Sequence, residues 1–102
     1  MDNNDAYYKK NVQFNYRSCN LSFRVSQSLF SSFSIDNGTQ RLLRTLTSEG
    51  LNNFNKILDL GCGYGPLGIS LKSVNRNCVV HMVDKDALAL KYSCQNAKLN
   101  SA

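Results

Sequence analysis

The hydrophobic and polar positions are most regularly spaced in the C-terminal half of the chain. Ile57–Leu60 is a short apolar run typical of a strand, and apolar residues at helical spacing follow Pro66, a favoured first residue of a helix. Cys78–Val83 is a nearly continuous apolar run, which predicts a strand buried on both faces. Asp86 is placed to cap a final helix, one face of which carries Ala87, Leu90, Cys94 and Ala97.

The N-terminal third shows the alternation of strands. Gln13–Arg17 and Leu21–Val25 each alternate in part, and Ser18–Asn20 is a turn candidate between them, so the pattern predicts a β-hairpin. A further short extended piece is expected at Ser28–Ser34. A helix is predicted after the break at Ile35–Thr39, and its apolar face carries Leu42, Leu43 and Leu46.

The order of these elements predicts an α/β fold. Two strands joined through a helix form a βαβ unit with a right-handed crossover, the core of a doubly wound parallel sheet. The predicted sheet is incomplete, because open sheets of this kind normally continue for several more strands. We expect residues 1–38 to form an N-terminal β-hairpin extension of the α/β unit.

Composition, charge and the length of the apolar runs indicate the class of protein and the partners it can have. Of the 102 residues, 42 % are hydrophobic and 19 % charged, which suits a packed core. No apolar run approaches the roughly 20 residues needed to span a bilayer, so no membrane partner is predicted. Met1–Asp5 lacks the basic and apolar order of a secretory signal, and we expect a cytoplasmic protein. The net charge of +5 favours contact with phosphate but decides nothing alone.

The four cysteines and one histidine do not predict a metal site. None of the cysteines forms a C-x-x-C pair, the close spacing that zinc ligands usually have. Their contexts are those of strand, loop and helix interiors, where a reduced thiol packs as a small apolar group. We expect His81 to pack within the sheet rather than to act as a base.

A glycine loop joins the first apolar strand to its helix. The string Asp59-Leu60-Gly61-Cys62-Gly63-Tyr64-Gly65 ends the strand, and glycines there let the backbone turn tightly and approach a ligand closely. The helix start beyond the loop offers free N–H groups. Asp84 follows 23 residues after Gly61, at the tip of the next predicted strand, where a carboxylate can accept both hydroxyls of a ribose.

Three classes of ligand use such a frame. A phosphate loop requires a lysine where Ile69 stands, so the sequence excludes it. A dinucleotide fingerprint can be written through Gly63, Gly65 and Gly68, but its first glycine comes late, and Asp59 would repel a pyrophosphate. A cationic ligand such as S-adenosylmethionine turns Asp59 into an attractive group. A purely structural glycine turn is the remaining alternative.

With Asp84, the glycine string resembles motif I and the ribose-binding acid of class I S-adenosylmethionine-dependent methyltransferases. The chain is similar over nearly its whole length to the methyltransferase small-domain family, which includes ribosomal RNA guanine-N2 methyltransferases. The segments that carry this likeness are Tyr7-Tyr8, Leu29–Ser31, Ile35–Thr39, Leu42-Leu43, Ile57–Gly68, Val83-Asp84, Ala87-Leu88 and Asn96–Asn100. The glycine motif is specific for the superfamily, whereas Leu29–Ser31 and Asp36–Thr39 point to this branch.

The resemblance implies a Rossmann-like methyltransferase fold, with residues 39–102 as the N-terminal half of the cofactor-binding domain. It implies S-adenosylmethionine as cofactor, ribosomal RNA as partner and the N2 amine of a guanine as methyl acceptor. The residues expected at the cofactor are Asp36, Gly38, Thr39, Asp59, Leu60, Gly61, Cys62, Gly63, Gly65, Asp84 and Lys85.

The chain departs from the family in lacking the N-P-P-F/Y type motif that grips the methyl acceptor, since its single proline is Pro66. The catalytic residues are therefore unknown, and these 102 residues alone are expected to be inactive. One alternative is that the chain is a non-catalytic fragment or an interaction module. Another is a methyltransferase that acts on a protein or a small molecule.

The aromatic and basic residues near the N-terminus permit two interpretations. Rings stack on bases and cations meet phosphates, so these side chains favour contact with RNA. They equally fit a hairpin that covers the sheet. The residues concerned are Tyr7, Tyr8, Lys9, Lys10, Phe14, Tyr16 and Arg17.

Overall fold

A computed structural model of the chain describes residues 8–26, 37–48 and 55–102. The elements are β1 (Tyr8–Tyr16), β2 (Cys19–Ser26), α1 (Asn37–Ser48), β3 (Lys56–Leu60), α2 (Pro66–Val74), β4 (Val79–Val83) and α3 (Ala87–Leu99). This is the predicted order of hairpin, helix and two strand–helix units. The extended piece expected at Ser28–Ser34 lies outside the described residues, as does Asp36.

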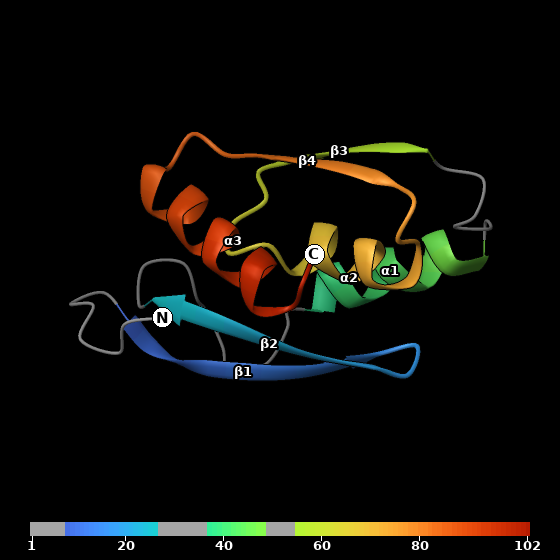
Figure 1. Cartoon of the computed structure of the whole chain (residues 1–102), viewed down its shortest axis with the longest axis horizontal. Coiled ribbons are helices and arrows are strands. Elements are labelled where there is room, and N and C mark those ends of the chain that lie inside the picture. The colour runs from blue at the N-terminus through green and yellow to red at the C-terminus, as the bar shows by residue number, and fades with distance from the viewer. Residues whose placement is uncertain (1–7, 27–36, 49–54) are drawn as a thin grey trace.

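The elements form three layers, with the helices in the middle (Figure 1). The parallel pair β3–β4 lies on one side of the helices and the antiparallel hairpin β1–β2 on the other. β3 and β4 pair without a shift from Lys56 opposite Val79 to Leu60 opposite Val83, so the carboxyl ends of both strands lie side by side. The predicted parallel βαβ unit is confirmed. No helix in the described parts of the chain is long and apolar enough to cross a bilayer.

The hairpin turns earlier than the sequence pattern predicts. Tyr16 pairs with Cys19, which leaves only Arg17 and Ser18 in the turn, whereas Ser18–Asn20 was expected there. Both turn residues have positive φ, 49° and 69°, the backbone that lets a two-residue loop follow the twist of the strands. The sequence signal was weak because neither residue is the glycine or asparagine that usually occupies such positions.

The hydrophobic core lies between the hairpin and the helices. The inward side chains of β2, including Phe23 and Val25, are fully buried, and they share one cluster with Leu43, Ile69 and Tyr92 of the three helices. The hairpin therefore covers the helical layer and not the sheet. On β1, Tyr16 is buried and Phe14 half-buried on this same inward side, so neither ring is free to stack on an RNA base. On α1, Leu43 is fully buried, whereas Leu42 is 44 % exposed.

The outer face of β3–β4 is open. Side chains alternate along both strands, and the outward set includes Leu58 at 60 % and Leu60 at 72 % exposed, with Val79 and Val83 beside them on β4. The prediction that the second strand is buried on both faces is therefore wrong, because helices cover one face only. His81 is exposed on the open face, which also contradicts the expectation that it packs within the sheet.

α3 buries a different face from the one that its apolar residues predicted. Leu90 is 40 % exposed, and Cys94 and Ala87 are exposed as well. The buried side chains are Ala89, Tyr92, Ser93 and Asn96. The periodicity was correct, but polar residues occupy the inner face because they form hydrogen bonds there, which apolar spacing cannot reveal.

Candidate functional site

The glycine loop is tied to the end of β4 through its backbone. The N–H groups of Gly61 and Cys62 both donate to the carbonyl oxygen of Val83, at 2.7 and 3.0 Å. The N–H of Gly65 donates to the carbonyl of Cys62 at 3.0 Å, which closes a tight turn. The loop therefore lies across the carboxyl ends of the two parallel strands, where open α/β sheets bind their ligands.

The loop glycines adopt left-handed backbone, with φ of 69° at Gly61, 59° at Gly63 and 101° at Gly65. Only glycine adopts such angles freely. A Cβ at Gly63 would meet no atom within 4 Å, so this glycine borders open space that a ligand can enter. A Cβ at Gly65 would come within 2.8 Å of Ile69 Cδ1, so that glycine is required by packing instead.

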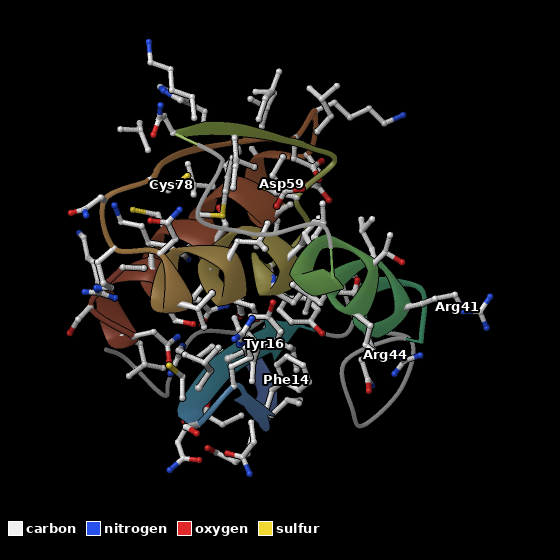
Figure 2. All side chains as sticks on the ribbon, turned by 90° about the vertical axis from the view of Figure 1, so that its right-hand side faces the viewer. Phe14, Tyr16, Arg41, Arg44, Asp59 and Cys78 are labelled. Atoms are coloured by element: carbon white, nitrogen blue, oxygen red, sulfur yellow. The ribbon has the colours of Figure 1, made fainter. Side chains whose placement is uncertain are left out.

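Asp59 is 6 % exposed and lies on the helix-facing side of β3, between the strand and the helices (Figure 2). Its Oδ2 accepts a hydrogen bond from the backbone N–H of Gly68 at 3.2 Å. α2 begins after Gly65, which has no side chain to cap the helix, so the strand carboxylate takes that role. Burial raises the pKa of Asp59, and the hydrogen bond from Gly68 offsets this only in part.

Asp84 holds the loop from the other strand. Its Oδ1 accepts from the backbone N–H of Asp86 at 2.9 Å, and its Oδ2 accepts from that of Gly63 at 3.0 Å. These two N–H groups, Asp86 first, keep the pKa of Asp84 below its ordinary value. The carboxylate is thus ionised and fixed, and each oxygen keeps lone-pair capacity for a further donor such as a hydroxyl.

The two carboxylates give the site its electrostatic character. The charge of Asp84 adds to the effect of burial in raising the pKa of Asp59, so the like charges repel across the loop. The N–H of Gly68 in the first turn of α2, one of those that would meet a phosphate, is already bonded to Asp59. The geometry therefore disfavours a phosphate and favours a ligand with positive charge and hydroxyl groups.

Cys62 is a structural part of the loop. Its side chain is 5 % exposed, and its Sγ lies 3.6 Å from the carbonyl oxygen of Gly63. Burial raises the pKa of the Cys62 thiol despite a side-chain hydrogen bond with Ser93. A neutral buried thiol is a poor nucleophile, so the role open to Cys62 is to shape the loop. All four cysteines are free thiols; Cys62 and Cys78 are buried as their contexts predicted, whereas Cys94 is exposed.

The remaining residues expected at the cofactor are less closely joined to the loop. Gly38 and Thr39 lie in the first turn of α1, Leu60 points to the open face of the sheet, and Lys85 is exposed beside Asp84. Their contact with a cofactor stays a prediction, as does that of Asp36. A separate cavity of about 220 Å³ lies between α2, β4 and the end of α3, and Asp59 and Asp84 do not line it.

Asn96 belongs to the Asn96–Asn100 segment of the family likeness, but it was not among the residues expected at the site. Its side chain is fully buried on α3, and its Nδ2 donates to the carbonyl oxygen of Tyr64 in the glycine loop at 2.8 Å. The available signal was an asparagine within a helix, a position that this residue type occupies at a cost unless its amide is used.

Comparison with known proteins supplies a context for this geometry. The family model described as "Methyltransferase small domain" matches residues 20–102. The chain is 33 % identical over 92 residues to "Uncharacterized protein YbxB" of Bacillus subtilis, and this match spans 90 % of the chain and 45 % of that protein. It is 31 % identical over 91 residues to "Ribosomal RNA large subunit methyltransferase G" of Shewanella woodyi, with 89 % and 21 % covered.

A solved structure shares the fold. It is a T. thermophilus 16S rRNA guanine-N2 methyltransferase in complex with AdoMet and guanosine, with a TM-score of 0.80 and 22 % identity. The alignment covers 94 % of this chain and 26 % of that one, so the Rossmann-like methyltransferase fold is present in part. The chain spans less than half the length of each of these relatives.

Proposed function

Because the chain belongs to the methyltransferase small-domain family, we propose that its glycine loop binds S-adenosylmethionine for methyl transfer. The observation that carries this proposal is the pair of carboxylates beside the loop: Asp59 of β3, bonded to Gly68 N–H, and Asp84 after β4, bonded to Gly63 N–H. A sulfonium and an amino group bring positive charge to a site in which two like charges repel, and a ribose brings the hydroxyls that Asp84 can accept.

The residues present fit this cofactor. Asp84 would accept the ribose hydroxyls, and its bonds from Asp86 and Gly63 already hold it in one orientation. The open side of Gly63 leaves room for a ligand that a side chain would obstruct. Asp59 would act through the field of its charge, because its carboxylate is buried and bonded to Gly68. The other proposed contacts are Asp36, Gly38, Thr39, Leu60, Gly61, Cys62, Gly65 and Lys85.

When bound, the cofactor supplies an electrophilic methyl group: a bond from the acceptor nitrogen to this carbon forms as the carbon–sulfur bond breaks, and the amine loses a proton. The chain's own contribution is to bind and orient. The loop holds one geometry through its bonds to Val83, Asp84 and Cys62, and such positioning supplies much of the rate of a transfer reaction.

The acceptor proposed for the whole protein is the N2 amine of a guanine in ribosomal RNA. The relatives named as ribosomal RNA methyltransferases support this substrate class. With it we propose a cytoplasmic location and a division of the chain into residues 1–38, an extension, and residues 39–102, half of the cofactor domain. The N-P-P-F/Y type motif is absent from the 102 residues, so the acceptor would be gripped by residues outside them.

The open face of β3–β4 favours a second proposal, that the chain as given is a half-domain without catalysis of its own. Leu58, Leu60, Val79 and Val83 form an exposed apolar face on a parallel sheet, and such sheets are normally covered on both faces. The proposed cover is the rest of the methyltransferase domain, on the same or a separate chain. Turnover by the 102-residue chain on unmodified ribosomal RNA would overturn this second proposal.

Calorimetry tests cofactor binding directly. We expect the chain to bind S-adenosylmethionine and its demethylated product. We do not expect it to bind NAD⁺, because the charge of Asp59 would repel the pyrophosphate. Asp84→Asn should weaken binding about tenfold or more, because charged acceptors bond hydroxyls most strongly. Asp86→Asn is the matched control: it removes the same charge two residues away, and asparagine still caps α3 through Leu88. A folded wild-type chain that bound NAD⁺ but not S-adenosylmethionine would contradict the proposal.

A further inference from the structure

Among the described residues, the edge of β2 that faces away from β1 is bonded by two side chains of α3. The backbone N–H of Arg24 donates to Asn96 Oδ1 at 2.7 Å, and Asn96 Nδ2 returns a bond to the Arg24 carbonyl at 3.0 Å. Asn100 repeats the pattern on Ser22, with distances of 2.9 and 2.7 Å. Each asparagine amide therefore bonds both backbone groups of one residue of β2, as a neighbouring strand would.

The two spacings match, which explains why a helix can pair with a strand here. Four residues of α-helix rise about 6 Å, and two residues of a strand about 7 Å. Asn96 and Asn100 are four residues apart, and Arg24 and Ser22 are two apart. The pairing fixes the hairpin to α3 along its edge.

Asn96 differs from Asn100 in one bond. Its Nδ2 also donates to the carbonyl of Tyr64 in the glycine loop at 2.8 Å, whereas Asn100 Nδ2 donates to the Asn96 carbonyl within its own helix. With this bond both hydrogens and the oxygen of the Asn96 amide are used, and the side chain is fully buried. A buried amide with every group satisfied holds its neighbours in one arrangement.

The bond fixes one peptide group of the loop. The carbonyl of Tyr64 and the N–H of Gly65 belong to the same peptide unit, and they are held by Asn96 and by the carbonyl of Cys62. This unit lies between Tyr64 and Gly65, and the glycine would otherwise let it rotate more easily. The Tyr64 ring also meets Phe23 of β2 edge-on, at 5.9 Å between centroids. Backbone and ring thus both join the loop to the hairpin.

We propose that Asn96 is a positioning residue for cofactor binding, which makes the hairpin a support of the glycine loop. It would set the Tyr64–Gly65 peptide unit so that the neighbouring Gly63 N–H meets Asp84 and the open side of Gly63 stays open. The inference rests on the proposed binding of S-adenosylmethionine at this loop. Asn96 itself would not touch the cofactor.

The matched pair Asn96→Ala and Asn100→Ala tests the proposal in the full chain. Both variants lose an edge pairing with β2, but only the first frees the loop. We expect hydrogen exchange at the Gly63 and Gly65 amides to rise at least tenfold in Asn96→Ala, and the dissociation constant for S-adenosylmethionine to rise roughly tenfold. In Asn100→Ala both values should stay within about twofold of wild type. Equal loop exchange and equal affinity in the two folded variants would overturn the proposal.

A measurement on the unaltered chain decides the question if Asn96→Ala does not fold. On titration with S-adenosylmethionine, the side-chain amide resonances of Asn96 should shift clearly more than those of Asn100. Equal shifts would contradict the proposal. A wild-type chain that bound no S-adenosylmethionine would contradict the proposed function instead. Loop exchange in Asn96→Asp would then still decide whether Asn96 holds the loop, since this variant keeps the acceptor for Arg24 N–H and lacks the donors.

Discussion

The carboxylate of Asp59 caps α2 from within β3, through its bond from Gly68 N–H at 3.2 Å. One acid therefore serves the fold and the proposed cofactor site together. The two roles make different demands, because a cap needs only an acceptor oxygen, whereas attraction of a cation needs the charge. Substitutions at this position can therefore separate the roles.

Asp59→Asn should weaken cofactor binding about tenfold while leaving the fold intact. An asparagine oxygen can still accept from Gly68, and the cost of a buried charge is removed. Because burial raises the pKa of Asp59, its ionised form lowers stability at neutral pH, and this cost fades as the pH falls through the raised pKa. The stability gain of Asp59→Asn should therefore be largest near pH 7 and shrink in acid, in urea unfolding followed at several pH values. A large loss of stability at pH 7 would contradict this account.

Asp84 should show the opposite pH dependence. Its pKa is lowered in the folded chain, so its ionised form adds stability above the ordinary value of 3.8 and loses it as the pH falls through the lowered pKa. The difference in unfolding free energy between wild type and Asp84→Asn should be constant from pH 7 to about pH 5 and decrease below pH 4. A difference that grew on acidification would exclude the loop-holding role of Asp84.

Gly68→Ala should destabilise the chain by roughly 1 to 3 kcal/mol. Alanine normally favours a helix interior over glycine, but here its Cβ would lie 3.0 Å from Val80, 3.1 Å from Asp59 Oδ2 and 3.1 Å from Met82. The contact with Asp59 Oδ2 would disturb the hydrogen bond by which this carboxylate caps α2. Ser73→Ala, later in the same helix, is the control, and thermal unfolding measures both. If Gly68→Ala increased the stability, the neighbouring side chains of β3 and β4 would have to move away from the new Cβ at little energetic cost.

Leu58→Gln should change the stability of the 102-residue chain by less than about 0.5 kcal/mol, although leucine is a typical core residue. Leu58 is 60 % exposed on the open sheet face. Ile69→Ala in the core, at 1 % exposure, should cost about 2 to 5 kcal/mol. Denaturant unfolding of the two variants compares the open sheet face with the core. A loss with Leu58→Gln as large as with Ile69→Ala would mean that the face is covered in solution.

Alkylation should distinguish the cysteines in a fixed order. Cys94 is exposed, whereas Cys62 is buried and its thiol pKa is raised, so its reactive thiolate is scarce. Iodoacetamide at neutral pH should label Cys94 first and Cys62 much later, as read by mass spectrometry of peptides. Binding of S-adenosylmethionine should slow Cys62 further and leave Cys94 unchanged. Early labelling of Cys62 would argue against the closed loop.

Much of the βαβ unit was predictable because its signals are local. The start of α2 at Pro66, the cap of α3 at Asp86 and the strand end before Asp84 follow from neighbouring residues. The position of the hairpin was not predictable, because the layer that it covers depends on contacts between segments far apart in the sequence. The inner face of α3 was missed for the same reason, because the partners of Asn96 lie 72 and 32 residues away in sequence. The exposure of Leu58 was missed because a sequence pattern predicts which side chains are apolar enough to be buried, but not whether another element packs over them.

The inward direction of Phe14 and Tyr16 has a consequence for the other side of the hairpin. That side carries the exposed amide side chains of Asn11, Gln13, Asn15 and Asn20, together with Arg24, which pairs with Asn11 across the hairpin and is buried. Amides can bond to sugar and base edges, but they displace no counterions from a nucleic acid. Any contact that a nucleic acid made through these exposed amides would therefore persist at high ionic strength, where contacts through lysine and arginine weaken.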